Sequence, residues 1–307
     1  MLESTFIRHL LRTDPPGTAA VLLPTGDDMA MLAVEGGRVL AAIDAVVEGR
    51  HFRPGTDLRL VARKALLRNL SDVAAMAARP LACVASVTLP RGARDADARA
   101  LLEGLREVAQ AFACPLVGGD TTVHAGDDPL VVSVAILAVP ALRGGRVITR
   151  RGSRLGDLVA VTGELGGSLG ADGGGRHLDF PPRIPEAIAL AEALGEELHA
   201  MLDLSDGLGI DASRLLAESP SLSIEIDVAR IPARRGVEWR RAVGDGEDFE
   251  LLFTTAAEPP EEVSGTPVRV IGRVVERGDG PTVRLLEGGR VIDGSAMGYD
   301  HGREDPR

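Results

Sequence analysis

Apolar and polar positions follow two different periods along the chain, and these periods predict both strands and helices. The apolar runs 30–34 and 39–43 are separated by Glu35-Gly36-Gly37-Arg38, which predicts a β-hairpin. Residues 58–76 place apolar side chains at helical spacing, with arginines, Lys64, Asn69 and Asp72 between them. The same criteria predict strands at 81–89, 115–117, 130–142, 157–162, 201–204, 223–228, 248–254, 268–274 and 282–286, and helices at 95–112, 185–194 and 210–217.

Both halves of the chain therefore mix strands with helices, which is typical of the α/β and α+β classes. A length of 307 residues corresponds to about two domains. The first half ends near Arg143-Gly144-Gly145-Arg146, so we expect an N-terminal domain at 1–145 and a C-terminal α+β domain at 146–307.

Charge and composition exclude several classes of function. A net charge of −11 repels polyanions, so neither nucleic acid nor an anionic membrane is expected as a partner. Lys64 is the only lysine and has no glycine around it, which excludes a P-loop enzyme. Cys83 and Cys114 stand in apolar stretches and are expected to be small buried thiols. The first ten residues lack a signal-peptide core and no apolar run reaches about 18 residues, which predicts a cytoplasmic protein.

Aspartates recur at the ends of apolar segments, and as a set they predict a metal site. Each one alone is most simply a helix cap or a turn residue. Buried together, carboxylates need cations, and hard oxygen ligands favour Mg²⁺, which could bridge to phosphate oxygens. The members of the set are Asp27, Asp28, Asp44, Asp72, Asp120, Asp203 and Asp206.

Three glycine-containing segments carry further candidate chemistry. Gly118-Gly119-Asp120 follows the predicted strand at 115–117, so its aspartate is expected at a strand end. Residues 203–207 combine two carboxylates and a hydroxyl at a strand-to-helix junction, where amide groups also attract anions. Residues 244–253 place three acidic residues before a strand. The glycines at 163–175 could cradle a phosphate or form a flexible hairpin, and taken alone they favour flexibility.

Eight motifs, in order over nearly the whole chain, resemble the thiamine-monophosphate kinase family of the aminoimidazole-ribonucleotide-synthetase-like superfamily. The motifs are Gly26-Asp27-Asp28, the 44–52 segment with His51, the 64–76 segment with Asn69 and Asp72, Gly119-Asp120-Thr121-Thr122, Thr149-Arg150, Asp203-Leu204-Ser205-Asp206-Gly207, Glu247-Asp248-Phe249-Glu250 and Gly298-Tyr299-Asp300-His301.

The resemblance implies a two-domain fold whose N-terminal α/β domain pairs with its twin in a homodimer. It also implies transfer of the γ-phosphoryl group of ATP to thiamine monophosphate, dependent on several Mg²⁺ ions. The seven aspartates would hold the metal, with Asp120, Asp206 and Arg150 in catalytic roles. Gly118, Gly119, Arg150 and Ser205 would meet ATP, and His51, Glu247 and the position of Ala296 would face the thiamine substrate. Direct in-line transfer is expected, since phosphoryl transfer needs mainly positioning and charge neutralisation; a phosphoenzyme at Asp120 or Asp206 is the alternative.

Three departures from the family pattern keep two other functions open. Ala42-Ile43 precede Asp44 where hydroxyl residues are usual, Asp245-Gly246 replaces a double glycine, and Ala296 stands where an aromatic residue is expected to stack on the substrate. The 163–182 region is also short. These departures favour a related ATP-dependent enzyme with another small-molecule acceptor. A Mg-ATP-binding protein without catalysis is the third hypothesis.

Overall fold

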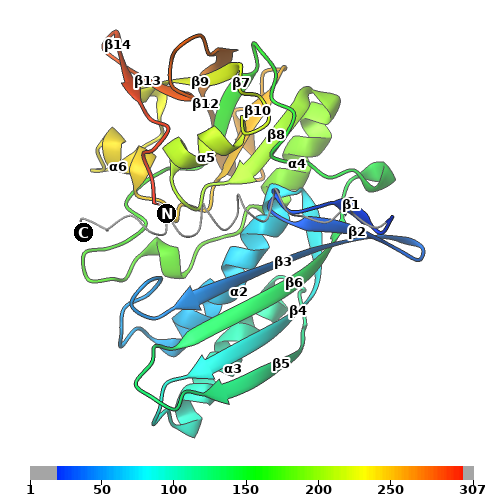
Figure 1. The fold of residues 1–307 in the computed structure, drawn as a ribbon, viewed down its shortest axis with the longest axis vertical. Coiled ribbons are helices and arrows are strands. Elements are labelled where there is room, and N and C mark those ends of the chain that lie inside the picture. Colours follow the sequence, from blue (N-terminus) through cyan, green and yellow to red (C-terminus); the bar gives the residue numbers. More distant parts are fainter. Residues whose placement is uncertain (1–18, 300–307) are drawn as a thin grey trace.

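The computed structural model describes residues 19–299, and within this range the strands form two separate sheets. The sheets follow one another along the long axis of the molecule (Figure 1). The first has six strands in the order β1-β2-β3-β6-β4-β5. The second has eight, in the order β14-β13-β9-β12-β7-β10-β8, with β11 paired to β12. The predictions for the first ten residues and for Asp300 and His301 lie outside the described range.

The first sheet confirms the predicted hairpin and the strands after it. Its strands are β1 (Val21–Leu23), β2 (Ala30–Val34), β3 (Gly37–Val47), β4 (Ala78–Leu89), β5 (Leu116–Val123) and β6 (Val131–Pro140). Gly36 turns β2 into β3 with a φ of 80°, a conformation that suits glycine because it has no side chain. The hairpin register pairs Met31 with Leu40.

Strand β5 is longer than predicted, so the expectation that Asp120 lies at a strand end is wrong. β5 runs parallel to β4, and the pairing continues through Gly119 opposite Ala85 and Asp120 opposite Ser86. A Cβ at Gly119 would lie 2.1 Å from the Ala85 carbonyl oxygen. Glycine therefore permits a close strand pairing that the turn prediction overlooked.

Two helices cover one face of the first sheet, and they confirm the predicted segments. Helix α2 (Leu58–Ala75) begins at Asp57, whose side chain accepts a hydrogen bond from the Arg59 amide at 2.9 Å. Helix α3 (Asp95–Ala111) packs against α2. The opposite face carries large apolar side chains that are exposed in the single chain, including Ile43 at 71% and Leu137 at 44%. One face of this sheet thus faces solvent.

The second half contains mostly antiparallel strands with short helices. Its strands are β7 (Leu158–Thr162), β8 (Leu198–Asp203), β9 (Leu222–Asp227), β10 (Leu251–Thr255), β11 (Glu262–Val263), β12 (Thr266–Glu276), β13 (Val283–Glu287) and β14 (Arg290–Asp293). Its helices are α4 (Ile184–Leu194), α5 (Leu208–Arg214) and α6 (Trp239–Gly244). The predicted elements of this half are confirmed, whereas α6, β11 and β14 were not predicted.

A continuous apolar core connects the two sheets through α2. One side of α2 packs under β3 and β6, and the helix also contacts α4 and β8 of the second half. The same cluster of buried side chains includes Leu66 and Leu70 of α2 together with Leu190 of α4 and Met201 of β8. Cys83 and Cys114 are buried free thiols, as predicted. The domain boundary at 145/146 stays a prediction.

No helix among residues 19–299 is both long enough and apolar enough to cross a membrane.

Candidate active site

Three carboxylates from distant parts of the chain meet between the two halves of the molecule. Asp28 precedes β2, Asp72 lies in the last turns of α2, and Asp203 ends β8. One oxygen from each lies within 4.8 Å of the others. The Asp203 carboxylate accepts a hydrogen bond of 2.5 Å from the Ser71 hydroxyl. The predicted gathering of these three residues is present in the structure.

The chemistry of this cluster fits a magnesium ion. Asp28 is buried, and its Oδ2 atom has no hydrogen-bond partner among the described residues. Burial, followed by repulsion from Asp44, raises the pKa of Asp72 well above its ordinary value. Burial and then repulsion from Asp28 raise the pKa of Asp203 to about 7. The three carboxylates repel one another, and one of them has an oxygen without a hydrogen-bond partner. A hard divalent cation would neutralise their charge and bind that oxygen.

These shifts predict how stability depends on pH and Mg²⁺. An unfolded aspartate has a pKa of about 3.9, so between that value and about 7 folded Asp203 holds a proton that the unfolded chain has released. The contribution of Asp203 to stability therefore falls as the pH rises through this window. We expect the metal-free protein to show a lower thermal midpoint at about pH 8 than at about pH 5, and Mg²⁺ to raise it at the higher pH.

Circular dichroism melts of the wild type and of Asp203→Asn, with chelator or with Mg²⁺, test this expectation. The variant should show a smaller dependence on pH. Equal pH dependence in both proteins, together with no effect of Mg²⁺ on the wild type, would contradict the assignment.

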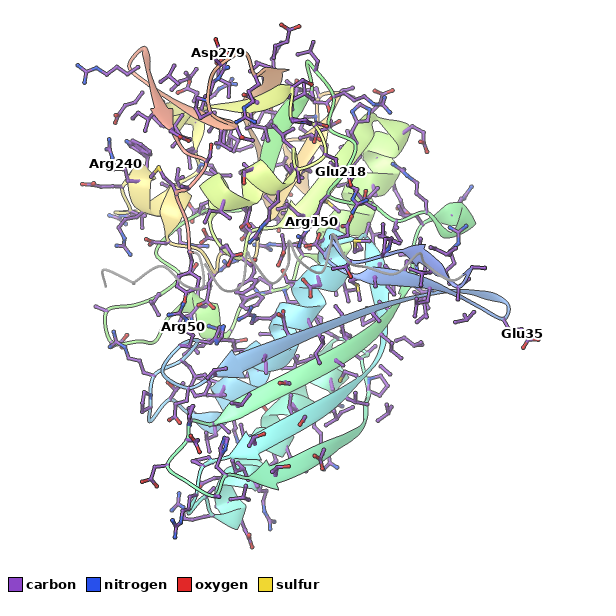
Figure 2. All side chains as sticks on the ribbon, in the orientation of Figure 1. Glu35, Arg50, Arg150, Glu218, Arg240 and Asp279 are labelled. Atoms are coloured by element: carbon purple, nitrogen blue, oxygen red, sulfur yellow. The ribbon has the colours of Figure 1, made fainter. Side chains whose placement is uncertain are left out.

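Arg150 and Asp27 lie directly beside the cluster. The Arg150 guanidinium donates to Asp28 Oδ1, with Nε at 3.1 Å, and Figure 2 labels Arg150 where the two halves meet. The Arg150 amide donates to Asp27 Oδ1 at 3.2 Å. Burial, with repulsion from Asp28, raises the pKa of Asp27 to about 6. The Arg150 guanidinium is thus already bonded to a cluster carboxylate.

Asp44 and Asp206 lie at the border of the cluster. Asp44 of β3 makes an ion pair with Arg68 at 3.6 Å, and its charge contributes to the raised pKa of Asp72. Asp206 accepts from Arg214 at 2.5 Å. Asp206 is not the helix cap that a lone aspartate most simply predicts, because the residue before α5 is Gly207 and the amides of residues 206 and 207 donate to Asp211.

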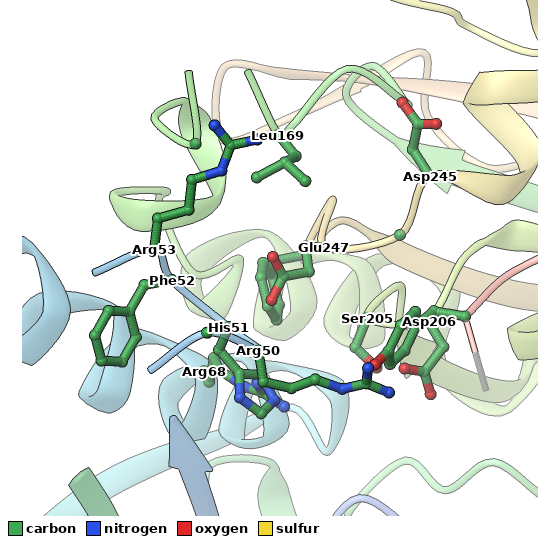
Figure 3. A pocket seen from close by; sticks show the side chains of 15 residues that line it. Arg50, His51, Phe52, Arg53, Arg68, Leu169, Ser205, Asp206, Asp245 and Glu247 are labelled. Carbon is green, nitrogen blue, oxygen red and sulfur yellow. The ribbon is translucent and has the colours of Figure 1, made fainter. Parts of the chain in front are cut away.

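A pocket of about 290 Å³ opens next to these residues (Figure 3). His51 and Glu247 line it together with Ser205 and Asp206, which brings two of the three predicted substrate residues to the border of the carboxylate cluster. The His51 ring accepts a hydrogen bond from the Val47 amide through Nδ1 at 3.0 Å, so a neutral ring carries its proton on Nε2. The rest of the lining includes Arg50, Arg53, Arg68, Phe249 and Tyr299.

Lys64, fully buried under the pocket, joins three of the segments that form its wall. Its ammonium group donates to the backbone carbonyl of His51 at 2.6 Å, contacts His177 Nδ1 at 2.8 Å and lies 2.7 Å from Glu247 Oε1. Burial lowers the pKa of Lys64 to about 8, although Glu247 attracts its charge. Burial alone would raise the pKa of Glu247, but the contacts to His177 and Lys64 lower it to about 2. Glu247 therefore faces the pocket as a carboxylate.

Comparison with known proteins places this arrangement in a family. A family model described as AIR synthase related protein, N-terminal domain, matches residues 26–139. A thiamine-monophosphate kinase of Rhodopirellula baltica is 32% identical to the chain, with 99% of this chain and 98% of the relative covered. A thiamine-monophosphate kinase of Caulobacter vibrioides is 34% identical, with 96% and 88% covered. This chain belongs to the thiamine-monophosphate kinase family.

The solved structures agree with membership of the thiamine-monophosphate kinase family. One described as "AaThiL complexed with AMPPCP and TMP" has a TM-score of 0.74 and 25% identity, and the match covers 95% of this chain and 94% of that one. The predicted family, the two-domain aminoimidazole-ribonucleotide-synthetase-like fold and the kinase class are therefore confirmed.

Asp120 lies apart from the other predicted metal ligands of this thiamine-monophosphate kinase family member. The register runs from Asp44 across β6 and β4 to Gly119 of β5, three strand spacings or about 14 Å away. Since neighbouring residues of a strand point to opposite faces, Asp120 lies on the face opposite to that of Asp44. Gly118 and Gly119 are on β5 as well, so within one chain these three residues do not join Arg150 and Ser205.

The position of Ala296, predicted to face the substrate, lies outside the pocket, whereas aromatic side chains from other positions line it. Ala296 is exposed and is not among the residues that line the pocket. Tyr299 does line it, with the Arg50 guanidinium 4.6 Å from the centre of its ring, and Phe249 adds a second aromatic side chain. Phe249 and Glu247 both have a positive φ, 51° and 54°, which is an uncommon conformation for residues with a side chain. The chain thus holds both residues in a strained loop beside the pocket.

The glycine-rich segment at 163–175 is more than a flexible hairpin, and two of its backbone amides bind carboxylates of the protein, which leaves them unable to bind a phosphate. The Gly166 amide donates to Asp248 and the Gly167 amide donates to Asp245, each at 2.9 Å. A Cβ at Gly163 would lie 2.4 Å from the Glu250 carboxyl group. These glycines are required because the loop packs closely around the acidic segment that carries Glu247.

Sequence reasoning missed Lys64 and Arg68 as site residues. Together with Asp72 they are spaced by four residues along α2, which places them on one side of the helix. That spacing was the available signal, but the surrounding arginines made these positions look like an exposed polar face.

Proposed function

We propose that this protein transfers the γ-phosphoryl group of ATP to the phosphate of thiamine monophosphate in the presence of Mg²⁺, giving thiamine diphosphate. The observation that carries the proposal is the carboxylate cluster with the unpartnered Asp28 Oδ2, beside a pocket that is lined by Glu247 and aromatic side chains. Membership of the thiamine-monophosphate kinase family supports this acceptor. A family relative has been solved with AMPPCP and TMP.

The proposed roles follow from the positions of the side chains. Asp28, Asp72 and Asp203 would hold Mg²⁺, with Asp27, Asp44 and Asp206 around them; when bound, Mg²⁺ neutralises phosphate charge. Arg150 and Ser205 would meet ATP at this border, and His51 and Glu247 would orient the acceptor. The carboxylate of Glu247 suits a positively charged or hydrogen-bond-donating part of the acceptor.

We propose direct in-line transfer, in which an acceptor phosphate oxygen attacks the γ-phosphorus as the bond to the β-phosphate oxygen breaks. The phosphoenzyme alternative has less support. Asp206 is paired with Arg214, and Asp120 lies across the sheet from the cluster. Retention of label on the protein after incubation with γ-labelled ATP alone would overturn direct transfer.

Chromatography of the thiamine phosphates after incubation with Mg-ATP and thiamine monophosphate tests the function. Formation of thiamine diphosphate is expected. ATP turnover only with another acceptor would replace thiamine monophosphate as the substrate, and binding of Mg-ATP without any turnover would leave a binding protein.

We also propose a homodimer formed by the open face of the first sheet. Ile43, Val84 and Leu137 lie on this face from three different strands and are exposed in the single chain. A contiguous apolar face of this kind is typical of an interface. Asp120 lies on the same face, so it would meet a nucleotide site only across the dimer.

A charged side chain at position 43 should break this dimer. We expect wild-type protein to have the mass of two chains in light scattering and Ile43→Asp to have the mass of one, because burying an unpaired carboxylate in an apolar interface is costly. Val291→Asp is the matched control, since Val291 is exposed on β14 of the other sheet. A wild type that is monomeric, or an Ile43→Asp variant that stays dimeric, would contradict the proposed interface.

A further inference from the structure

One side of α2 connects the acceptor pocket to the carboxylate cluster. Lys64, Arg68 and Asp72 follow one another at intervals of four residues, each step rising about 6 Å along the helix. Lys64 bonds to Glu247 under the pocket, whereas Asp72 belongs to the carboxylate cluster. Arg68 lies between them and lines the pocket (Figure 3). Its guanidinium is therefore at the boundary between the two parts of the site.

Arg68 makes few contacts for a guanidinium in this position. Within residues 19–299 its closest ionic partner is Asp44, at 3.6 Å, which is longer than a hydrogen bond. Its Nε atom is buried and has no hydrogen-bond partner among those residues. An arginine carries five N–H donors, and buried donors are normally satisfied. Its terminal nitrogens make no hydrogen bond to the described residues beyond the 3.6 Å ion pair, so their donors are available at the pocket that Arg68 lines.

The other arginines around the site already have partners within the protein. Arg150 donates to Asp28, Arg53 donates to the Ala171 carbonyl at 3.0 Å, and Arg50 lies over the Tyr299 ring. Among these pocket and cluster arginines, Arg68 is the one with a buried donor that has no acceptor in the described part of the chain.

The surroundings keep Arg68 charged. Burial lowers the pKa of its guanidinium, but attraction to Asp44, and then to Glu247 and Asp72, raises the pKa overall. A planar, charged guanidinium group with unused N–H donors can donate two hydrogen bonds to the oxygens of a phosphate group. The acceptor proposed above carries its phosphate on the side that must approach the γ-phosphoryl group, which is the side where Arg68 lies.

We propose that Arg68 binds the phosphate of the acceptor and holds it at the boundary between the pocket and the carboxylate cluster. This inference rests on the proposed function, since it takes thiamine monophosphate as the acceptor. It adds a residue that none of the predicted site assignments contained. A purely structural role, as a counterion of Asp44, would not distinguish an acceptor with a phosphate from one without it.

Affinities for thiamine monophosphate and for thiamine, measured by calorimetry with Mg²⁺ and AMPPCP present, test the proposal. We expect Arg68→Gln to weaken binding of thiamine monophosphate by about tenfold or more, the loss typical of a hydrogen bond to a charged group. Binding of thiamine should stay within about twofold, because thiamine has no phosphate for Arg68 to bind. Arg68→Lys should recover part of the loss, because lysine keeps the positive charge but lacks the paired donors of the guanidinium group.

Arg63→Gln is the matched control on the same helix, because Arg63 pairs with Asp179 outside the pocket. It should leave both affinities unchanged, and circular dichroism melts verify that every variant is folded. Unchanged binding of thiamine monophosphate in Arg68→Gln, or equal weakening of both ligands, would overturn the role of Arg68. If the wild type binds thiamine monophosphate but forms no thiamine diphosphate, the proposed function is wrong. The effect of Arg68→Gln on thiamine monophosphate binding relative to thiamine binding still tests the role of Arg68. Wild-type protein that binds no thiamine monophosphate would overturn both.

Discussion

Asp72→Asn is expected to lower ATP-dependent turnover by about 1000-fold, because removing one charged metal ligand removes several kcal/mol of charge stabilisation from phosphoryl transfer. The same substitution should leave the fold intact or stabilise it in the absence of metal. Burial and the nearby charge of Asp44 raise the pKa of Asp72, so its ionised form opposes folding. Steady-state kinetics and thermal melts with and without Mg²⁺ measure the two effects.

Asp279→Asn is the control for this substitution, since Asp279 lies in the turn between β12 and β13 at the far end of the second sheet (Figure 2). It should change neither turnover nor the effect of Mg²⁺ on stability. Turnover of Asp72→Asn within a few-fold of the wild type at saturating Mg²⁺ would remove Asp72 from the proposed metal site.

Lys64→Met should be the most destabilising substitution in the site. It removes the ammonium group that pairs with Glu247 and leaves the His51 carbonyl without that donor. Breaking a buried ion pair from one side costs about 3–5 kcal/mol. Because Glu247 is partly exposed to the pocket, with 26% of its side chain accessible, we expect the lower part of that range. Urea denaturation gives the change in the free energy of unfolding.

The double variant Lys64→Met with Glu247→Gln separates the ion pair from packing effects. Removing both charges should recover part of the stability lost in Lys64→Met, since no uncompensated carboxylate is then left. Strictly additive losses would show that the charges are not coupled, against the 2.7 Å contact between them.

Local patterns predicted most elements because each depends on neighbouring residues. The β2–β3 hairpin follows from two apolar runs around a glycine turn, and α2 follows from the helical spacing of its apolar residues. Short elements such as α6 and β14 escaped prediction, because so few residues give no clear period.

Contacts between distant segments were harder to predict from single-chain patterns. Asp72 and Asp203 were chosen as metal candidates, and they do meet, although 131 positions separate them. Lys64 was not among the predicted site residues, because its partner Glu247 comes from 183 residues further along the chain. Asp120 was chosen because the glycines before it predicted a turn. The parallel pairing of β4 and β5 instead continues through these glycines, so Asp120 lies in the middle of a strand.

The shared core under the two sheets has a consequence for cooperativity. Leu66 and Leu70 of α2 pack in the same buried cluster as Leu190 and Met201 of the second half. Swinging the halves apart as rigid bodies would expose that apolar surface to water, which is unfavourable in proportion to its area. We therefore expect the two halves to melt as one unit, and substrates to enter by movement of the loops around the pocket while the core stays closed.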